Sequence, residues 1–165
     1  MRDHLNTSSF GYRLFLYTTP FEIMRTFVSD NGLFELDFPS DWKYELSDDH
    51  HIHQFYSVEG IGSFHFSVPN NQVKQTFEEF SIKSKAYEKR IGGIITYEIL
   101  AKNADEFNTL LWLIKVQDTY FLASYTYSNL PQVQEQFLQE LEVIYSIIGS
   151  LKVINLSERL EKISA

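Results

Sequence analysis

The most informative stretch of this sequence is QEQFLQELEVIYSIIGSLKV, residues 134–153. Apolar side chains recur in and just before it at spacings of 4, 4, 3 and 4, the repeat of one helix face: Val133, Phe137, Leu141, Ile144 and Ile148. Pro131 stands in the first turn and Gly149 follows the last, as is usual at helix ends. We therefore expect a long amphipathic helix, followed by a short strand at 150–154.

Upstream of this helix, apolar and polar residues alternate in the way that predicts half-buried strands. Leu33–Phe38 and Ser63–Val68 show this pattern, and Gly60–Gly62 reads as the turn that precedes the second strand. The expected strands are 33–38, about 52–58, 63–68, about 94–101, 107–117 and 119–127. Leu110–Ile114 is apolar at consecutive positions, so we expect both of its faces to be covered.

Residues 75–90 change to a helical period, with Phe77, Phe80 and Tyr87 on one face and Gly92-Gly93 as the end. The basic run Lys83–Arg90 is then the solvated face of that helix, and a grip on an acidic partner or a phosphate is the alternative. Helices on both sides of a mainly antiparallel sheet predict an α+β fold, a three-layer α/β/α sandwich.

Two segments resemble the PsbP-like superfamily. FELDFPSDWKYE, residues 34–45, is similar to the opening strand of that fold and its Pro-x-x-Trp turn, and residues 134–153 are similar to its closing helix and return strand. The superfamily includes extrinsic photosystem proteins, an import factor that binds the GTPase Ran, and many bacterial proteins. The chain most resembles the bacterial branch. The resemblance implies a sandwich used for protein contacts, usually without enzymatic activity, and it implies no partner or functional residue.

Composition excludes several kinds of chemistry. The 165 residues contain no cysteine, so disulfides, thiolate metal sites and cysteine nucleophiles are absent. A formal net charge of -8 disfavours nucleic acid and anionic membranes as partners. No phosphate loop, dinucleotide fingerprint, nucleophile elbow or H-E-x-x-H motif occurs, so we expect neither an enzyme nor a cofactor. A cytoplasmic location is the default.

The chain divides into three parts. Residues 1–25 differ in composition and are interpreted as an N-terminal extension that is either non-native or loosely packed, the alternative being an element that covers one face of the sheet. The resemblance implies that residues 26–154 form a single PsbP-like domain. Residues 155–165 are a C-terminal tail with a short helix.

Three tyrosines on the last predicted hairpin are candidates for partner contact. Tyr125 and Tyr127 share one face with Phe121, and Tyr120 takes the other face. Tyrosine is favoured at protein interfaces because its ring is apolar and its hydroxyl is polar. An exposed aromatic patch is therefore one interpretation, and core packing is the other.

A histidine cluster is the candidate metal site. His51 and His53 lie two residues apart in an extended stretch, and His65 lies on the neighbouring predicted strand. Such spacing suits zinc, nickel or copper, although a polar, solvated strand end fits equally. The histidines also offer a pH sensor.

These patterns favour a non-catalytic protein-interaction domain with an adaptor, regulatory or immunity-type role. The alternative is a small-molecule or metal-binding protein centred on His51, His53 and His65. A homodimer closed by the tyrosine hairpin is a third option.

Overall fold

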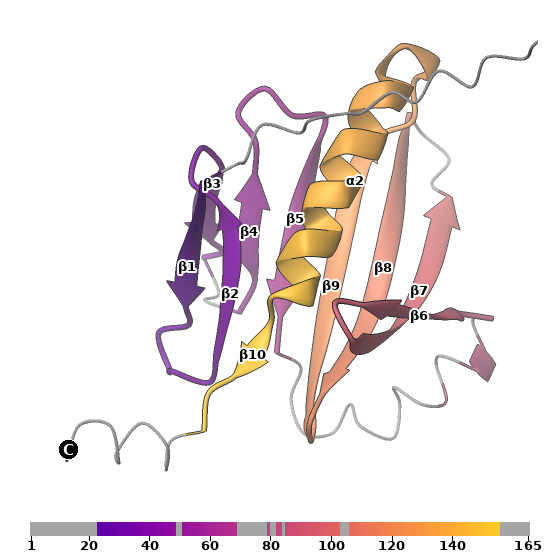
Figure 1. Cartoon of the computed structure of the whole chain (residues 1–165). Coiled ribbons are helices and arrows are strands. Elements are labelled where there is room, and N and C mark those ends of the chain that lie inside the picture. The colour runs from indigo at the N-terminus through magenta and orange to yellow at the C-terminus, as the bar shows by residue number, and fades with distance from the viewer. Residues whose placement is uncertain are drawn as a thin grey trace, which may run out of the picture.

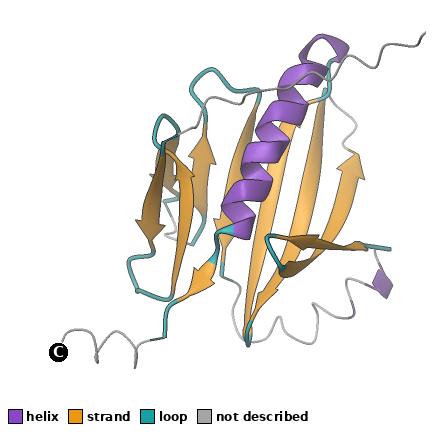
Figure 2. Ribbon diagram, in the orientation of Figure 1, coloured by secondary structure: helices purple, strands orange, loops and turns teal. Residues whose placement is uncertain are grey.

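The computed structural model describes residues 23–48, 51–68, 79, 82–83, 85–102 and 106–155. Within these ranges the chain has the α+β fold expected from the sequence, with two antiparallel sheets and one long helix (Figures 1 and 2). In chain order the elements are β1 (Met24–Val28), β2 (Phe34–Pro39), β3 (Lys43–Leu46), β4 (His53–Tyr56), β5 (Gly62–Ser67), β6 (Tyr87–Ile91), β7 (Ile94–Lys102), β8 (Phe107–Val116), β9 (Thr119–Ser128), η1 (Pro131–Val133), α2 (Gln134–Gly149) and β10 (Lys152–Val153).

The larger sheet has seven strands in the order β3-β4-β5-β9-β8-β7-β6, and the smaller has three in the order β1-β2-β10. The smaller sheet packs on one face of the larger sheet through aromatic rings. Phe27 lies 5.5 Å from Phe55, and Phe34 lies 5.1 Å from Phe66, measured between ring centroids. Burying such rings is the main source of stability, at roughly 1.5–3 kcal/mol for each large apolar side chain.

Helix α2 covers the same face of the larger sheet (Figure 1). Phe137 stacks on Tyr127 with ring centroids 4.2 Å apart, and the centroid of Tyr145 lies 6.1 Å from that of Trp112. At the C-terminal end of α2, the Asp37 amide of β2 donates to Ser150 Oγ at 2.8 Å. The core is therefore enclosed by the sheet on one side and by α2 with the smaller sheet on the other.

The opposite face of the larger sheet carries a second, smaller apolar cluster. Leu113 and Tyr120 are buried there, and the half-buried Tyr97 packs against them. Leu110, Trp112 and Ile114, which alternate with Leu113, are buried on the α2 side. The expectation that the apolar run in β8 is covered on both faces is confirmed.

The predicted helix over 75–90 is wrong in its last part. Residues 79, 82 and 83 are helical, but residues 87–91 form strand β6, which pairs with β7. Gly92 and Gly93, with φ of 57° and 86°, form the two-residue hairpin turn between them rather than a helix end. The error arose because residues four apart, such as Tyr87 and Ile91, share a face in a strand as well as in a helix.

Several expectations fall outside the described residues: most of the segment 75–84, which would supply a second helical layer, and the short helix in the C-terminal tail. Most of the proposed extension 1–25 also lies outside them, but Met24 and Arg25 belong to β1, where they pair with Pro39 and Phe38. No helix in the described part of the chain is both long and apolar enough to cross a membrane.

Candidate interaction surface

The tyrosines predicted to contact a partner are buried. Tyr125 has no exposed surface and Tyr127 is 7% exposed, because both rings stack beneath Phe137 of α2. Tyr120 lies on the opposite face, as the alternation predicted, and is also buried. These rings fill the core, which is the second of the two interpretations given above, and they do not form an exposed aromatic patch.

Tyr125 is held by a buried carboxylate on α2. Its hydroxyl donates to Glu140 Oε2 at 2.6 Å, and the other oxygen, Oε1, accepts from the amide of Ile61 at 2.9 Å. Glu140 is only 8% exposed. Burial, reinforced by the Glu140 hydrogen bond, raises the pKa of Tyr125 far above its ordinary value. This arrangement fastens α2 to β9 and to the turn before β5.

The structure does not bring the three histidines together. His53 pairs with Phe66 on the core face, where its Nδ1 lies 3.1 Å from the Tyr44 hydroxyl. His65 pairs with Gln54 on the other face of the sheet. His51 is exposed and precedes β4. Among the described residues, no group of three potential ligands could hold a metal ion.

Burial also sets the protonation of two of these imidazoles. It lowers the pKa of His53, against a smaller opposing effect of Asp30, and it lowers the pKa of His65. Both rings are therefore neutral at pH 7. They act as packing and hydrogen-bonding groups within the sheet.

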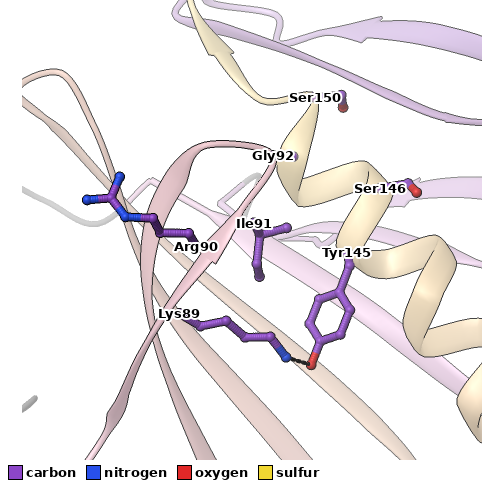
Figure 3. A pocket seen from close by; sticks show the side chains of 8 residues that line it. Lys89, Arg90, Ile91, Gly92, Tyr145, Ser146 and Ser150 are labelled. Atoms are coloured by element: carbon purple, nitrogen blue, oxygen red, sulfur yellow. Dashed lines mark hydrogen bonds between the residues drawn. The ribbon is translucent and has the colours of Figure 1, made fainter.

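A groove of about 580 Å³ opens between the β6–β7 hairpin and the C-terminal half of α2 (Figure 3). Its walls are residues 89–92 of the hairpin and Tyr145, Ser146, Gly149 and Ser150 at the end of the helix. The two walls meet at Gly92 and Gly149, and position 92 in particular has no room for a side chain. A Cβ added to Gly92 would lie 2.6 Å from Gly149 Cα, well inside contact distance.

A chain of polar contacts anchors the hairpin across this groove. Lys89 Nζ donates to the Tyr145 hydroxyl at 2.6 Å, and that hydroxyl donates to Glu98 Oε2 at 2.8 Å. Trp112 Nε1 donates to the same oxygen at 2.8 Å. Lys89 also lies 3.5 Å from Glu98, so the charge of its ammonium group is balanced within the chain. Burial and the bond to Glu98 raise the pKa of Tyr145, which keeps this hydroxyl protonated.

The other face of β6 is left exposed. Arg90 points away from α2 in Figure 3, and Glu88 and Arg90 are both exposed. Within the described residues, neither side chain has a hydrogen bond or an ion pair. Tyr87, which lies at the start of the strand on the same face as Lys89, is also 79% exposed.

Among the described residues β6 is also an edge strand, the last in the order of the seven-stranded sheet. In a two-residue hairpin the residues that flank the turn are hydrogen-bonded to each other, which here are Ile91 and Ile94. Backbone hydrogen bonds alternate along the ladder, so the N–H and C=O groups of Lys89 and Tyr87 also point toward β7. The N–H and C=O groups of Glu88 and Arg90 point the opposite way, out from the free edge.

Sequence reasoning missed this edge because residues 83–90 were interpreted as helix. A usable signal was present, since Ile-Gly-Gly-Ile at 91–94 places the most favoured type of hairpin turn between two β-branched residues.

Comparisons with known proteins bear on the fold. No protein family matches the sequence, and no curated protein does. A crystal structure from Bacteroides thetaiotaomicron is similar at a TM-score of 0.60 and 18% identity, over 79% of this chain and 48% of that one. The chain thus spans about half the length of that protein.

Two further structures belong to the group that the sequence resembles. PsbP from the cyanobacterium Synechocystis sp. PCC 6803 aligns at a TM-score of 0.47 and 9% identity, over 83% of this chain and 96% of that one. Protein Mog1 aligns at 0.49 and 10% identity, over 82% and 98%. The α+β fold predicted from the sequence is the fold of this chain. At these identities the likeness describes the fold alone.

Proposed function

We propose that this chain is a non-catalytic protein-interaction domain that receives an extended segment of a partner along the free edge of β6. The observation that carries the proposal is the edge itself: backbone groups of Glu88 and Arg90 project from the last strand of the sheet beside exposed side chains. Addition of a strand to a free sheet edge is a recurrent mode of peptide recognition, in which backbone hydrogen bonds supply affinity and side chains supply specificity.

The edge is held in place before any partner arrives. The close approach of Gly92 to Gly149 and the Lys89–Tyr145 hydrogen bond fix the hairpin against α2. A surface that is ordered in the free protein loses less conformational entropy on binding, which favours affinity.

The net charge of -8 would speed encounter with a basic foreign partner, as in an adaptor, regulatory or immunity-type role, and would slow encounter between two copies of this chain. A cytoplasmic location remains part of this proposal.

The proposal can be tested with proline at the edge. Because the Glu88 N–H faces outward, Glu88→Pro leaves the β6–β7 ladder intact but removes a donor from the free edge. We expect a partner captured by the wild type from a native-host lysate to be lost with Glu88→Pro. It should be retained with Leu138→Ala, a substitution of an exposed residue on α2. Equal capture by all three proteins, with unchanged circular dichroism, would exclude β6 as the contact.

A further inference from the structure

We infer that the segment received by β6 is the β6 strand of a second copy, paired antiparallel about a two-fold axis at Lys89. This inference rests on the proposed function and names its partner. It would extend the seven-stranded sheet of each copy across the interface. Such an isologous contact requires that one short strand be complementary to itself.

The sequence of β6 meets that requirement in one register. With Lys89 on the axis, Glu88 of each copy lies opposite Arg90 of the other, and both lie on the exposed face. Opposite charges directly across an antiparallel pair are stabilising, and like charges are destabilising. Sliding the pair by two residues places either two Glu88 or two Arg90 side chains face to face. The alternation of charge therefore selects one alignment.

The backbone agrees with this register. The N–H and C=O groups of Glu88 and Arg90 both project from the free edge, so each Glu88–Arg90 pair can exchange two hydrogen bonds across the interface. A slip by one residue would bring the α2 side of one sheet against the exposed side of the other. It would also set outward backbone groups against inward ones.

Lys89 would face the Lys89 of the second copy on the axis. The repulsion between the two ammonium groups is reduced by contacts that each already makes within its own chain. Its ammonium group is bound to the Tyr145 hydroxyl at 2.6 Å and lies 3.5 Å from Glu98. It also sits over the Tyr145 ring, 3.9 Å from the centroid. The charge is thus directed toward the helix of its own chain and away from the edge.

The other edge of the larger sheet, β3, is a weaker candidate. Its charged residues Lys43 and Glu45 also alternate, but the Glu45 carboxylate accepts a hydrogen bond from Tyr56 at 2.5 Å. Pairing through β3 would have to compete with that contact. Glu88 and Arg90 of β6 have no such contact within the described residues.

A contact built on a strand of five residues is small. We therefore expect reversible self-association with a Kd on the order of 10–100 µM rather than a permanent dimer. The like net charges of two copies oppose association, and about 0.15 M salt limits that repulsion to a range of about 8 Å.

Sedimentation equilibrium over a concentration series up to about ten times that Kd tests the inference. The wild-type mass should rise from 19.4 kDa toward twice that value. Glu88→Arg and Arg90→Glu should each raise the Kd at least tenfold, because each sets like charges opposite in both pairs. The double variant Glu88→Arg/Arg90→Glu restores opposite charges and should dimerise again.

Mixing the two single variants provides the sharpest result. One variant has arginine at both positions and the other has glutamate at both, so a one-to-one mixture should form a heterodimer although neither forms a homodimer. A wild type that stays at 19.4 kDa overturns self-pairing. The proposed function then stands if Glu88→Pro still loses a foreign partner, and fails with the inference if it does not. A dimer that is indifferent to all four charge tests also overturns the inference.

Discussion

Removal of a single hydroxyl group, by Tyr125→Phe, tests how α2 is fastened to the sheet. The Tyr125 hydroxyl donates to Glu140 Oε2 at 2.6 Å, with Tyr125 fully buried and Glu140 8% exposed. A hydrogen bond to a charged group contributes about 1.5–3 kcal/mol. Since Glu140 is too buried for water to replace the donor freely, we expect a loss of about 2–3 kcal/mol. For a chain of this length that corresponds to a fall in Tm of about 4–12 °C.

The matched control is Tyr127→Phe, two residues along the same face of β9. Tyr127 is 7% exposed and stacks on Phe137 like its neighbour, but its hydroxyl has no hydrogen bond in the described part of the chain. We expect a change within about 0.5 kcal/mol. Urea denaturation followed by circular dichroism measures both. If the two variants lose equal stability, the hydrogen bond from Tyr125 to Glu140 does not stabilise the packing of α2 on the sheet.

The same variant predicts a difference at high pH. Burial and the Glu140 bond raise the pKa of Tyr125 well above 10, so the folded chain keeps a proton that the unfolded chain releases. The resulting stabilisation is complete below pH 10 and falls as the pH rises above it, by about 1.4 kcal/mol per pH unit. Tyr125→Phe has no such slope. Its stability deficit relative to the wild type should therefore narrow above pH 10.

Three further predictions concern the hairpin and the histidines. Gly92→Ala should lower the free energy of unfolding, measured by urea denaturation, by about 2–4 kcal/mol. Gly93→Ala, whose added Cβ meets nothing within 4 Å, should lower it by about 1 kcal/mol. Equal losses would mean that the contact of Gly92 with α2 does not contribute to stability. Tyr145→Phe should cost about 1 kcal/mol in the same assay, since Glu98 keeps its bond from Trp112, and no loss would show that the anchor is dispensable. Because burial lowers the pKa of His53, the stability that its neutral imidazole gives the folded state is present above pH 6.5 and is lost as the pH falls below that value. The Tm of His53→Gln should therefore fall less between pH 7 and pH 5 than the Tm of the wild type. Parallel curves of Tm against pH would contradict this.

Local patterns were sufficient for most elements of the fold. The spacing of apolar residues from Val133 to Ile148 predicted α2, and alternation predicted the strands that became β2 and β5. These signals succeed because a helix or strand with one buried face repeats that face in its own sequence. The same alternation correctly separated Tyr120 from Tyr125. It could not show that α2 covers the Tyr125 face, because that depends on tertiary packing.

The prediction that the three histidines lie together was wrong for a related reason. His65 lies on the face of the sheet opposite the core, and convergence with His53 depended on the register between β4 and β5. Phe55 pairs with Phe64, so both lie in the core, and His53, two residues from Phe55, must lie there as well. Register is set by the turn at 57–61 and by packing across strands, neither of which is visible within one strand.

β6 shows how one strand can serve stability and recognition on opposite faces. Ile91 and Lys89 point toward the helix, where Ile91 is 5% exposed and Lys89 is bound by Tyr145. Glu88 and Arg90 alternate with them and face away, and their side chains have no hydrogen bond or ion pair within the described residues. Because period-2 alternation separates the two sets, substitutions at 88 and 90 can change the choice of partner while the contacts that fix the hairpin stay intact. Natural sheet edges are often protected by lysines that repel any added strand. The alternating charges of β6 instead repel misaligned strands and accept one that carries the reversed order, which is the order that a second antiparallel β6 presents.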